Sequence, residues 1–136
     1  MNLDQIRAAD AFSFVQPIAG NKDLAEAFLG LARKLPVMLQ TNGLLASWAH
    51  LVSKKGAEYG KTAEALLQHL QKVGLAEPQP ADPRRVLLEV WTGSALTGDT
   101  LRRLTQESII YAVWLKRAAE ALCDRGKPTG GEGDRT

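Results

Sequence analysis

Several residue types and patterns are scarce in this chain of 136 residues, and each scarcity excludes a class of protein. The single cysteine, Cys123, cannot form an internal disulfide, so we expect a reducing, cytoplasmic setting and a small apolar filler near a helix end. No apolar run approaches the roughly 18 residues of a membrane span. The first residues also lack the basic start and apolar stretch of a secretory signal. The sequence therefore indicates a protein with no membrane partner.

The residues that usually carry catalysis are few or scattered. The two histidines, His50 and His69, fall on different predicted helices, and no cysteine cluster accompanies them, so no metal site is expected. The acidic residues are dispersed and mostly neighbour basic ones, which leaves no carboxylate pair for acid–base chemistry. No glycine-rich phosphate loop is present. We therefore expect a protein that is not an enzyme and uses no cofactor.

Charge is nearly balanced, at a formal net +2, but it is unevenly distributed. Residues 33–72 contain six lysines and arginines against two glutamates, and residues 84–117 contain six against three acids. A modest basic surface of this kind follows a phosphate backbone when other subunits supply most of the affinity. The two basic regions therefore predict where a nucleic acid would lie.

Helical periodicity dominates the chain, and strand signals are almost absent. We expect a single compact all-α domain of about six or seven helices over residues 1–124. The tail, residues 125–136, holds four glycines and no apolar residue, so it is predicted to be disordered. The first helix should end at Pro17, and a kink or a new helix is expected at Pro36.

Capping residues and glycines predict the other helix boundaries. Asn21 should begin the second helix, and Gly43 fits a left-handed position at a helix end. Prolines in residues 77–83 predict a linker, with Asp82 as the cap of the helix that follows. Thr97 should open the last and longest helix. The aromatic residues expected in the core are Phe12, Phe28, Trp48, Tyr59, Trp91 and Trp114.

Two segments far apart in the sequence combine a helical apolar stripe with polar and basic residues. In residues 34–45, the polar run Gln40-Thr41-Asn42 suits either phosphate and ribose oxygens or the carbonyls of the helix itself. In residues 104–117, Lys116-Arg117 share one side with Ile109 and Val113, which suits a partner-covered surface or a solvated helix face. The opposite, core-facing side is predicted to contain Leu104, Ile110, Tyr111, Trp114, Leu115, Ala118, Ala121 and Leu122.

These two segments carry a resemblance to a known family. Lys34-Leu35-Pro36 followed by Gln40-Thr41-Asn42-Gly43-Leu44, with residues 104–108 leading into residues 114–122, resembles the small subunit of the Cmr-type (type III-B) CRISPR effector complex. The resemblance implies an all-helical, non-catalytic subunit that stacks on copies of itself and on a large polymerase-like subunit. That minor filament would lie beside the major-filament subunits, and its basic face would support the duplex of guide RNA and target RNA.

The resemblance also implies which residues face RNA. The first motif contributes Lys34, Gln40 and Asn42, and the second contributes Lys116 and Arg117. Charge alone adds five further candidates: Arg33, Lys54, Lys61, Arg102 and Arg103.

Three other functions stay open at this point. One is the equivalent small subunit of the Csm-type (type III-A) complex, another is a helical DNA-binding regulator, and the third is a helical adaptor without nucleic acid. A DNA-reading helix needs exposed arginine, asparagine or glutamine after a tight turn. The helix after Gly43 begins instead with Leu44, Leu45 and Ala46, which fits a regulator poorly.

Overall fold

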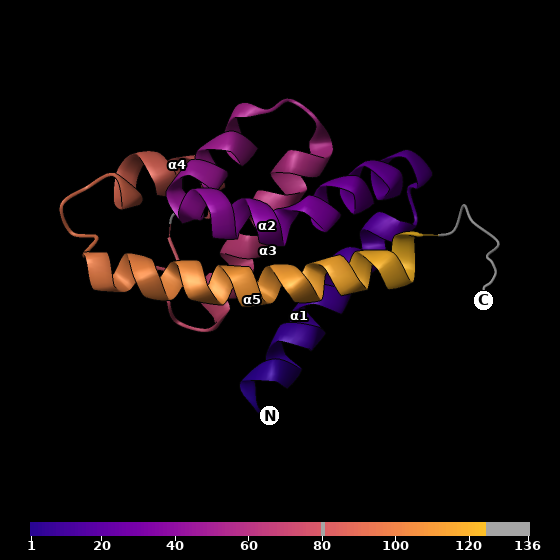
Figure 1. Ribbon diagram of the computed structural model, residues 1–136, viewed down its shortest axis with the longest axis horizontal. Helices are drawn as coiled ribbons and strands as arrows, with labels where there is room; N and C mark the ends of the chain where they lie inside the picture. Colours follow the sequence, from indigo (N-terminus) through magenta and orange to yellow (C-terminus); the bar gives the residue numbers. More distant parts are fainter. Residues whose placement is uncertain (80, 125–136) are drawn as a thin grey trace.

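The computed structural model describes residues 1–79 and 81–124, and every regular element within them is helical (Figure 1). The predicted all-α fold is therefore confirmed. Six or seven helices is a slight overestimate of the five found, because residues 22–53 form one element with a single internal break. The predicted disordered tail lies outside the described residues. The elements are α1 (Leu3–Ala19), α2 (Lys22–Ser53), α3 (Ala57–Lys72), α4 (Pro83–Val86), the π-helical turn η1 (Leu87–Trp91) and α5 (Gly98–Cys123).

Side-chain caps set where the helices begin, as the sequence predicted. Asn21 Oδ1 accepts a hydrogen bond from a backbone N–H in the first turn of α2 at 3.2 Å. Asp82 caps α4 at 3.0 Å with Pro83 at the first helical position, and Thr97 caps α5 at 3.1 Å. Each cap satisfies an N–H group that has no partner inside the helix, which stabilises a helix by about 1 kcal/mol.

The two prolines inside helices do not end them. Pro17 lies in the last turn of α1, which continues to Ala19, so the predicted end is wrong by two residues. The ring removes the bond to the carbonyl four residues earlier. That carbonyl belongs to Ser13, an exposed residue, so the missing bond costs less there than it would in the core. A new helix does not begin at Pro36, because the backbone angles stay helical through that residue, whereas the helix junction predicted at Gly43 is present.

Gly43 is the one residue of α2 with non-helical backbone angles, φ 81° and ψ 171°. The positive φ was predicted, but ψ is extended rather than left-handed helical. This combination is accessible essentially to glycine alone. Across the break, Ser47 Oγ donates to the carbonyl of Met38 at 3.1 Å and so ties the two parts of α2 together. The break redirects residues 44–53 away from the axis of the first part of α2.

The core lies where α5 packs against α1, α2 and α3 (Figure 1). Trp48 is fully buried and its ring meets Trp91 edge-on, with ring centroids 4.6 Å apart. Cys123 is buried near the end of α5, as predicted. Phe12 is the aromatic residue whose predicted burial is wrong, since it is 36% exposed. Among the described helices, none is long and apolar enough to cross a bilayer.

The buried side of α5 differs from the prediction at six positions, two of which are the buried polar residues Glu107 and Ser108. Ile110 is 41% exposed and Ala121 is exposed, although both were expected to face the core. Ala112 and Ala119 are fully buried in their place. Because α5 contacts three helices, a small side chain lets a neighbouring helix approach closely, which hydrophobicity alone does not predict. The expected residues that are buried are Leu104, Tyr111, Leu115 and Ala118, with Trp114 and Leu122 half-buried.

Candidate nucleic-acid interface

Nine of the ten residues predicted to face RNA are exposed, and the tenth, Lys116, is half-buried. The exposed residues are Arg33, Lys34, Gln40, Asn42, Lys54, Lys61, Arg102, Arg103 and Arg117. They do not form one continuous patch. Some lie on the surface shared by α2 and α5, Lys54 lies at a separate corner where α2, α3 and α4 meet, and others, such as Lys34, lie outside both.

Arg33 connects α2 to α5 at the surface. Its guanidinium lies 3.2 Å from Glu120 Oε2 and 3.2 Å from Asp124 Oδ2. The first part of α2 and the whole of α5 run in opposite directions (Figure 1). Residues one and two turns after Arg33 therefore lie beside residues one to three turns before Glu120. We call this surface the α2–α5 face: Arg33, Val37, Gln40, Ile109, Val113, Lys116 and Glu120.

The α2–α5 face is partly apolar and has free cations at its edge. Val37 is 64% exposed, and Ile109 and Val113 are half-buried. Within the described ranges, Lys116 and Arg117 make no ion pair, and the Arg117 guanidinium lies 5.8 Å from the ring centroid of Trp114. An apolar strip edged by free positive charge is typical of a surface that a partner covers.

Other predicted residues are less available for a ligand. Arg33 is engaged by Glu120 and Asp124, Lys61 lies 3.7 Å from Glu64, and Arg102 is paired with Asp99. These contacts neutralise much of the positive charge that the sequence suggested. Lys34 makes no ion pair with any residue that the structure describes, but it lies about 100° around α2 from Arg33, so it is not part of the α2–α5 face.

Gln40 and Asn42 differ from the usual polar residues of a helix end. Both are exposed, and neither side chain bonds a helix carbonyl among the described residues. The alternative in which they satisfy carbonyls of their own helix is therefore not what the structure shows. Their amide groups are available to a ligand, next to the break at Gly43.

A second basic corner contains Lys54 and also a residue that the sequence analysis did not select. Lys54 and Arg84 line the same small cleft beside the start of α4. The Arg84 Nη2 atom donates to the carbonyl of Val52 at 2.6 Å, which holds the guanidinium near the end of α2. The dipeptide Arg84-Arg85 after a predicted helix cap was the signal available in the sequence.

The sequence analysis also missed a buried network of charged side chains that joins α1, α3 and α5. Arg7 binds Glu107 with two hydrogen bonds of 2.8 and 2.7 Å. The His69 ring is 1% exposed and lies between two carboxylates, with Nδ1 2.7 Å from Asp10 Oδ2 and Nε2 2.7 Å from Glu107 Oε2. Lys72 Nζ lies 2.8 Å from Asp10 Oδ1.

Both ring nitrogens of His69 and all the carboxylate oxygens of Asp10 and Glu107 have partners within the network. The Tyr111 ring stacks on His69 with centroids 3.9 Å apart and planes within 6°. No group of histidine, cysteine and acidic residues in the described part of the chain is arranged to hold a metal ion. Arg7 and Asp10 are three residues apart on α1, and His69 and Lys72 are three residues apart on α3. Each pair therefore lies on one side of its helix, and this equal spacing was visible in the sequence. The network fixes how three helices pack.

Glu107 gives the network a pH dependence. Burial raises the pKa of the Glu107 carboxyl, but hydrogen bonds from Arg7 and His69 outweigh it and hold the pKa below its usual value of 4.5. A carboxyl whose pKa is lower in the folded state stabilises the fold fully above its unfolded pKa. That stability is lost as the pH falls through the folded pKa.

We therefore expect the melting temperature to fall on acidification through about pH 4, where the unfolded carboxyl titrates. Differential scanning calorimetry across that range measures the slope. The variant Glu107→Gln, which does not titrate there, should show a shallower slope than the wild-type chain. Parallel slopes for both proteins would contradict the role given to Glu107.

The comparisons with known proteins agree on one family. The model of the family described as CRISPR-associated protein (Cas_Cmr5) matches residues 3–122. A crystal structure of a CRISPR-associated Cmr5 family protein from Thermus thermophilus superposes with a TM-score of 0.72 at 25% sequence identity. That match covers 91% of this chain and 99% of the Thermus chain. No curated protein matches this sequence.

The fold and the family match define a small helical CRISPR-associated protein. The chain belongs to the Cas_Cmr5 family, the small subunits of type III-B (Cmr) CRISPR complexes. The family suggested by the two sequence motifs is therefore confirmed. Membership also implies assembly with other subunits of a Cmr complex.

Proposed function

We propose that the chain is a non-catalytic subunit of a cytoplasmic type III-B ribonucleoprotein in antiviral defence. It stacks on copies of itself and on the large polymerase-like subunit to form the minor filament. Its basic surface supports the duplex of guide RNA and target RNA, which the major-filament subunits hold. The observation that carries the RNA role is the pair of free cations, Lys116 and Arg117, at the edge of the α2–α5 face.

The mechanism is electrostatic support rather than sequence reading. Lys116 and Arg117 contact phosphates, and the amides of Gln40 and Asn42 bond ribose or phosphate oxygens, so no base is read. Such contacts fix the position of the strand but supply only part of the affinity. The apolar residues Val37, Ile109 and Val113 are suited to a neighbouring subunit rather than to RNA.

The structure disfavours the DNA-binding regulator considered earlier. Leu44 and Trp48 at the start of the helix after Gly43 are 1% and 0% exposed, so this helix presents its first turns to the core. The family match likewise favours the Cmr-type over the Csm-type complex.

Reversing both free cations tests the proposal. In the assembled complex, Lys116→Glu with Arg117→Glu should weaken target-RNA binding about tenfold or more, because two phosphate contacts are lost and two repulsions are introduced. A filter-binding or anisotropy titration with labelled target RNA at moderate salt measures the effect. The slope of log K against log salt should also become shallower.

A matched control separates local contact from overall charge. Lys22→Glu makes the same change of charge as Lys116→Glu alone, at an exposed position of α2 outside the candidate interface, so these two single variants are compared with each other beside the double variant. The Lys22 variant should bind target RNA like the wild type. Equal weakening by both variants, or no weakening by the double variant, would refute this site.

A further inference from the structure

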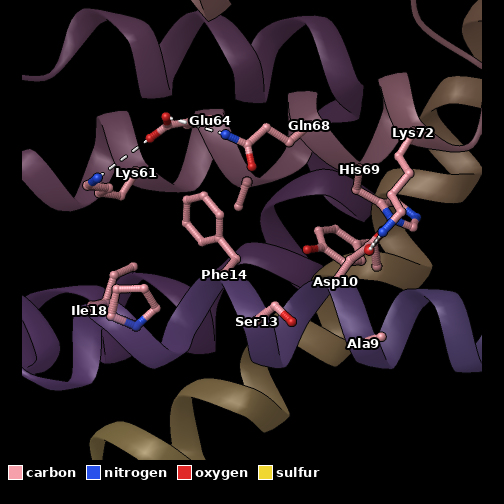
Figure 2. Close-up of a pocket in the computed structure, with 13 residues that line it drawn as sticks. Ala9, Asp10, Ser13, Phe14, Ile18, Lys61, Glu64, Gln68, His69 and Lys72 are labelled. Atoms are coloured by element: carbon pink, nitrogen blue, oxygen red, sulfur yellow. Dashed lines mark hydrogen bonds and ion pairs between the residues drawn. The ribbon is translucent and has the colours of Figure 1, made fainter.

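The buried network contains a histidine whose neighbours decide how many protons its ring carries. Figure 2 shows the His69 ring and the Lys72 side chain reaching from α3 toward Asp10 on α1. Nδ1 of the ring lies 2.7 Å from Asp10 Oδ2, and Nε2 lies 2.7 Å from Glu107 Oε2. A neutral imidazole has one N–H and one lone pair, so it can donate to only one of two carboxylates.

Both of these carboxylates are also bound by a cation other than His69. Arg7 donates to the two oxygens of Glu107 at 2.8 and 2.7 Å. The Lys72 ammonium donates to Asp10 Oδ1 at 2.8 Å. A guanidinium or an ammonium favours the charged form of the carboxylate that it binds. The oxygens that face His69 are therefore acceptors, and both ring nitrogens have to donate.

The charge of the network agrees with a protonated ring. In the described part of the chain, the network consists of Asp4, Arg7, Asp10, His69, Lys72 and Glu107. Three members are acids, and the arginine and the lysine supply two positive charges. A neutral His69 would leave one negative charge unbalanced, which is costly because the two carboxylates beside the ring are only 10% and 7% exposed.

The ring stacked on His69 also suits a cation. The Tyr111 ring lies parallel to the imidazole with centroids 3.9 Å apart, and the face of an aromatic ring attracts positive charge. Burial raises the pKa of the Tyr111 hydroxyl, and the nearby Asp10 charge adds to the effect. The phenol therefore stays neutral and contributes no charge of its own to the network.

We propose that His69 carries both ring protons at neutral pH and that this imidazolium holds α1 against α3 and α5. Each ring N–H binds a carboxylate from a different helix, so one side chain of α3 connects the other two helices. Loss of either proton would turn one of the 2.7 Å contacts into a repulsion between a lone pair and a carboxylate. Because α1 packs mainly on α5, it is the helix that such a loss would release. The role of His69 depends on none of the proposed RNA contacts.

Nuclear magnetic resonance of the full-length chain with ¹⁵N-labelled histidines tests the number of protons at about pH 7.5. A histidine in water is mostly neutral at this pH. His69 should nevertheless show two ring N–H signals, identified by nuclear Overhauser effects to the Tyr111 ring. The ring of exposed His50 exchanges its protons with water and should show none, so it is the internal control. One signal or none from His69 would overturn the proposal.

Amide hydrogen exchange in variants tests whether the ring charge holds α1. Glutamine imitates a neutral ring, because its amide donates on one side only. The α1 amides of the His69→Gln variant should therefore exchange at least about tenfold faster than in the wild type. Adding Asp10→Asn removes the unbalanced carboxylate and should slow the exchange again, whereas Asp10→Asn alone should speed it. Asp4→Asn is the matched control, since it neutralises an exposed acid of α1 and should change little.

A neutral ring beside a protonated Asp10 predicts a different pattern. Asp10→Asn alone would then exchange like the wild type, because an amide N–H replaces the carboxyl proton, and it would not rescue His69→Gln. Either result would overturn the proposal, as would faster exchange spread evenly over all helices. The proton count is made on the wild-type chain, so it decides the question even if His69→Gln does not fold. Since no measurement contains RNA, failure here leaves the proposed RNA role standing.

Discussion

The variant Glu107→Ala should lose about 3–5 kcal/mol of unfolding free energy, the loss expected when one partner of a buried ion pair is removed. The Arg7 side chain is 12% exposed and the His69 side chain is fully enclosed, so neither can regain water when the carboxylate is absent. Arg7 would keep only its bond to Asp4 and His69 only its contact with Asp10, and the groups that now meet Glu107 would face a space without an acceptor. The packing of α1 and α3 on α5 depends on that carboxylate.

Urea denaturation followed by circular dichroism measures this loss. Glu120→Ala is the matched control, because it removes a glutamate from the same helix and from an ion pair with another arginine. The Arg33–Glu120 pair is 46% and 38% exposed, so its loss should change the unfolding free energy by about 1 kcal/mol or less. Similar destabilisation by the two variants would show that burial of the network does not matter.

The second large effect is expected for Trp48→Ala, at about 3–5 kcal/mol. Trp48 is fully buried, and its Nε1 donates to the carbonyl of Pro83 at 2.8 Å while its ring contacts Trp91. Truncation leaves a cavity and removes the contacts that hold α4 and η1 against α2. The short α4–η1 segment has few other long-range contacts in the described structure.

A graded series separates packing from hydrogen bonding at this position. Trp48→Phe retains most of the apolar volume but loses the bond to Pro83, so its loss should be closer to about 1–3 kcal/mol. Hydrogen exchange should show faster exchange of the amides of residues 84–91 in both variants than in the wild type. If exchange increased evenly over all helices, Trp48 would not be the specific link to α4.

The helix boundaries were predictable where a local side chain decides them. Asn21, Asp82 and Thr97 cap the backbone next to themselves, so the cap depends on a few consecutive residues. The break in α2 was likewise predictable at Gly43, where a glycine permits the positive φ. The new helix expected at Pro36 is not found, because proline weakens a helix without always ending it. Ile110 was misplaced because three neighbouring helices select which side of α5 is buried.

The residue types of the candidate interface were predictable from the sequence. Which of its positive charges are paired with an acid was not. Lys116 and Arg117 are free within the described ranges, whereas Arg33, Lys61 and Arg102 are each engaged by an acid. Arg33 meets Glu120, which is 87 residues away, and no local pattern reveals such a pairing. The buried network joins positions that are also far apart, so its members looked like ordinary surface charges in the sequence. Long-range pairing is the part that residue patterns do not encode.

The separation of Arg7 and Glu107 has a consequence for how the chain is made. The two residues are 100 positions apart, and His69 and Asp10 are 59 apart. Helix α1 therefore cannot complete its contacts until α5 has been synthesised at least as far as Glu107. Until then its apolar residues Ala11, Val15 and Ile18, buried in the finished protein, lack their final cover. During synthesis α1 is thus exposed to proteases and self-association for as long as those 100 residues take to follow it.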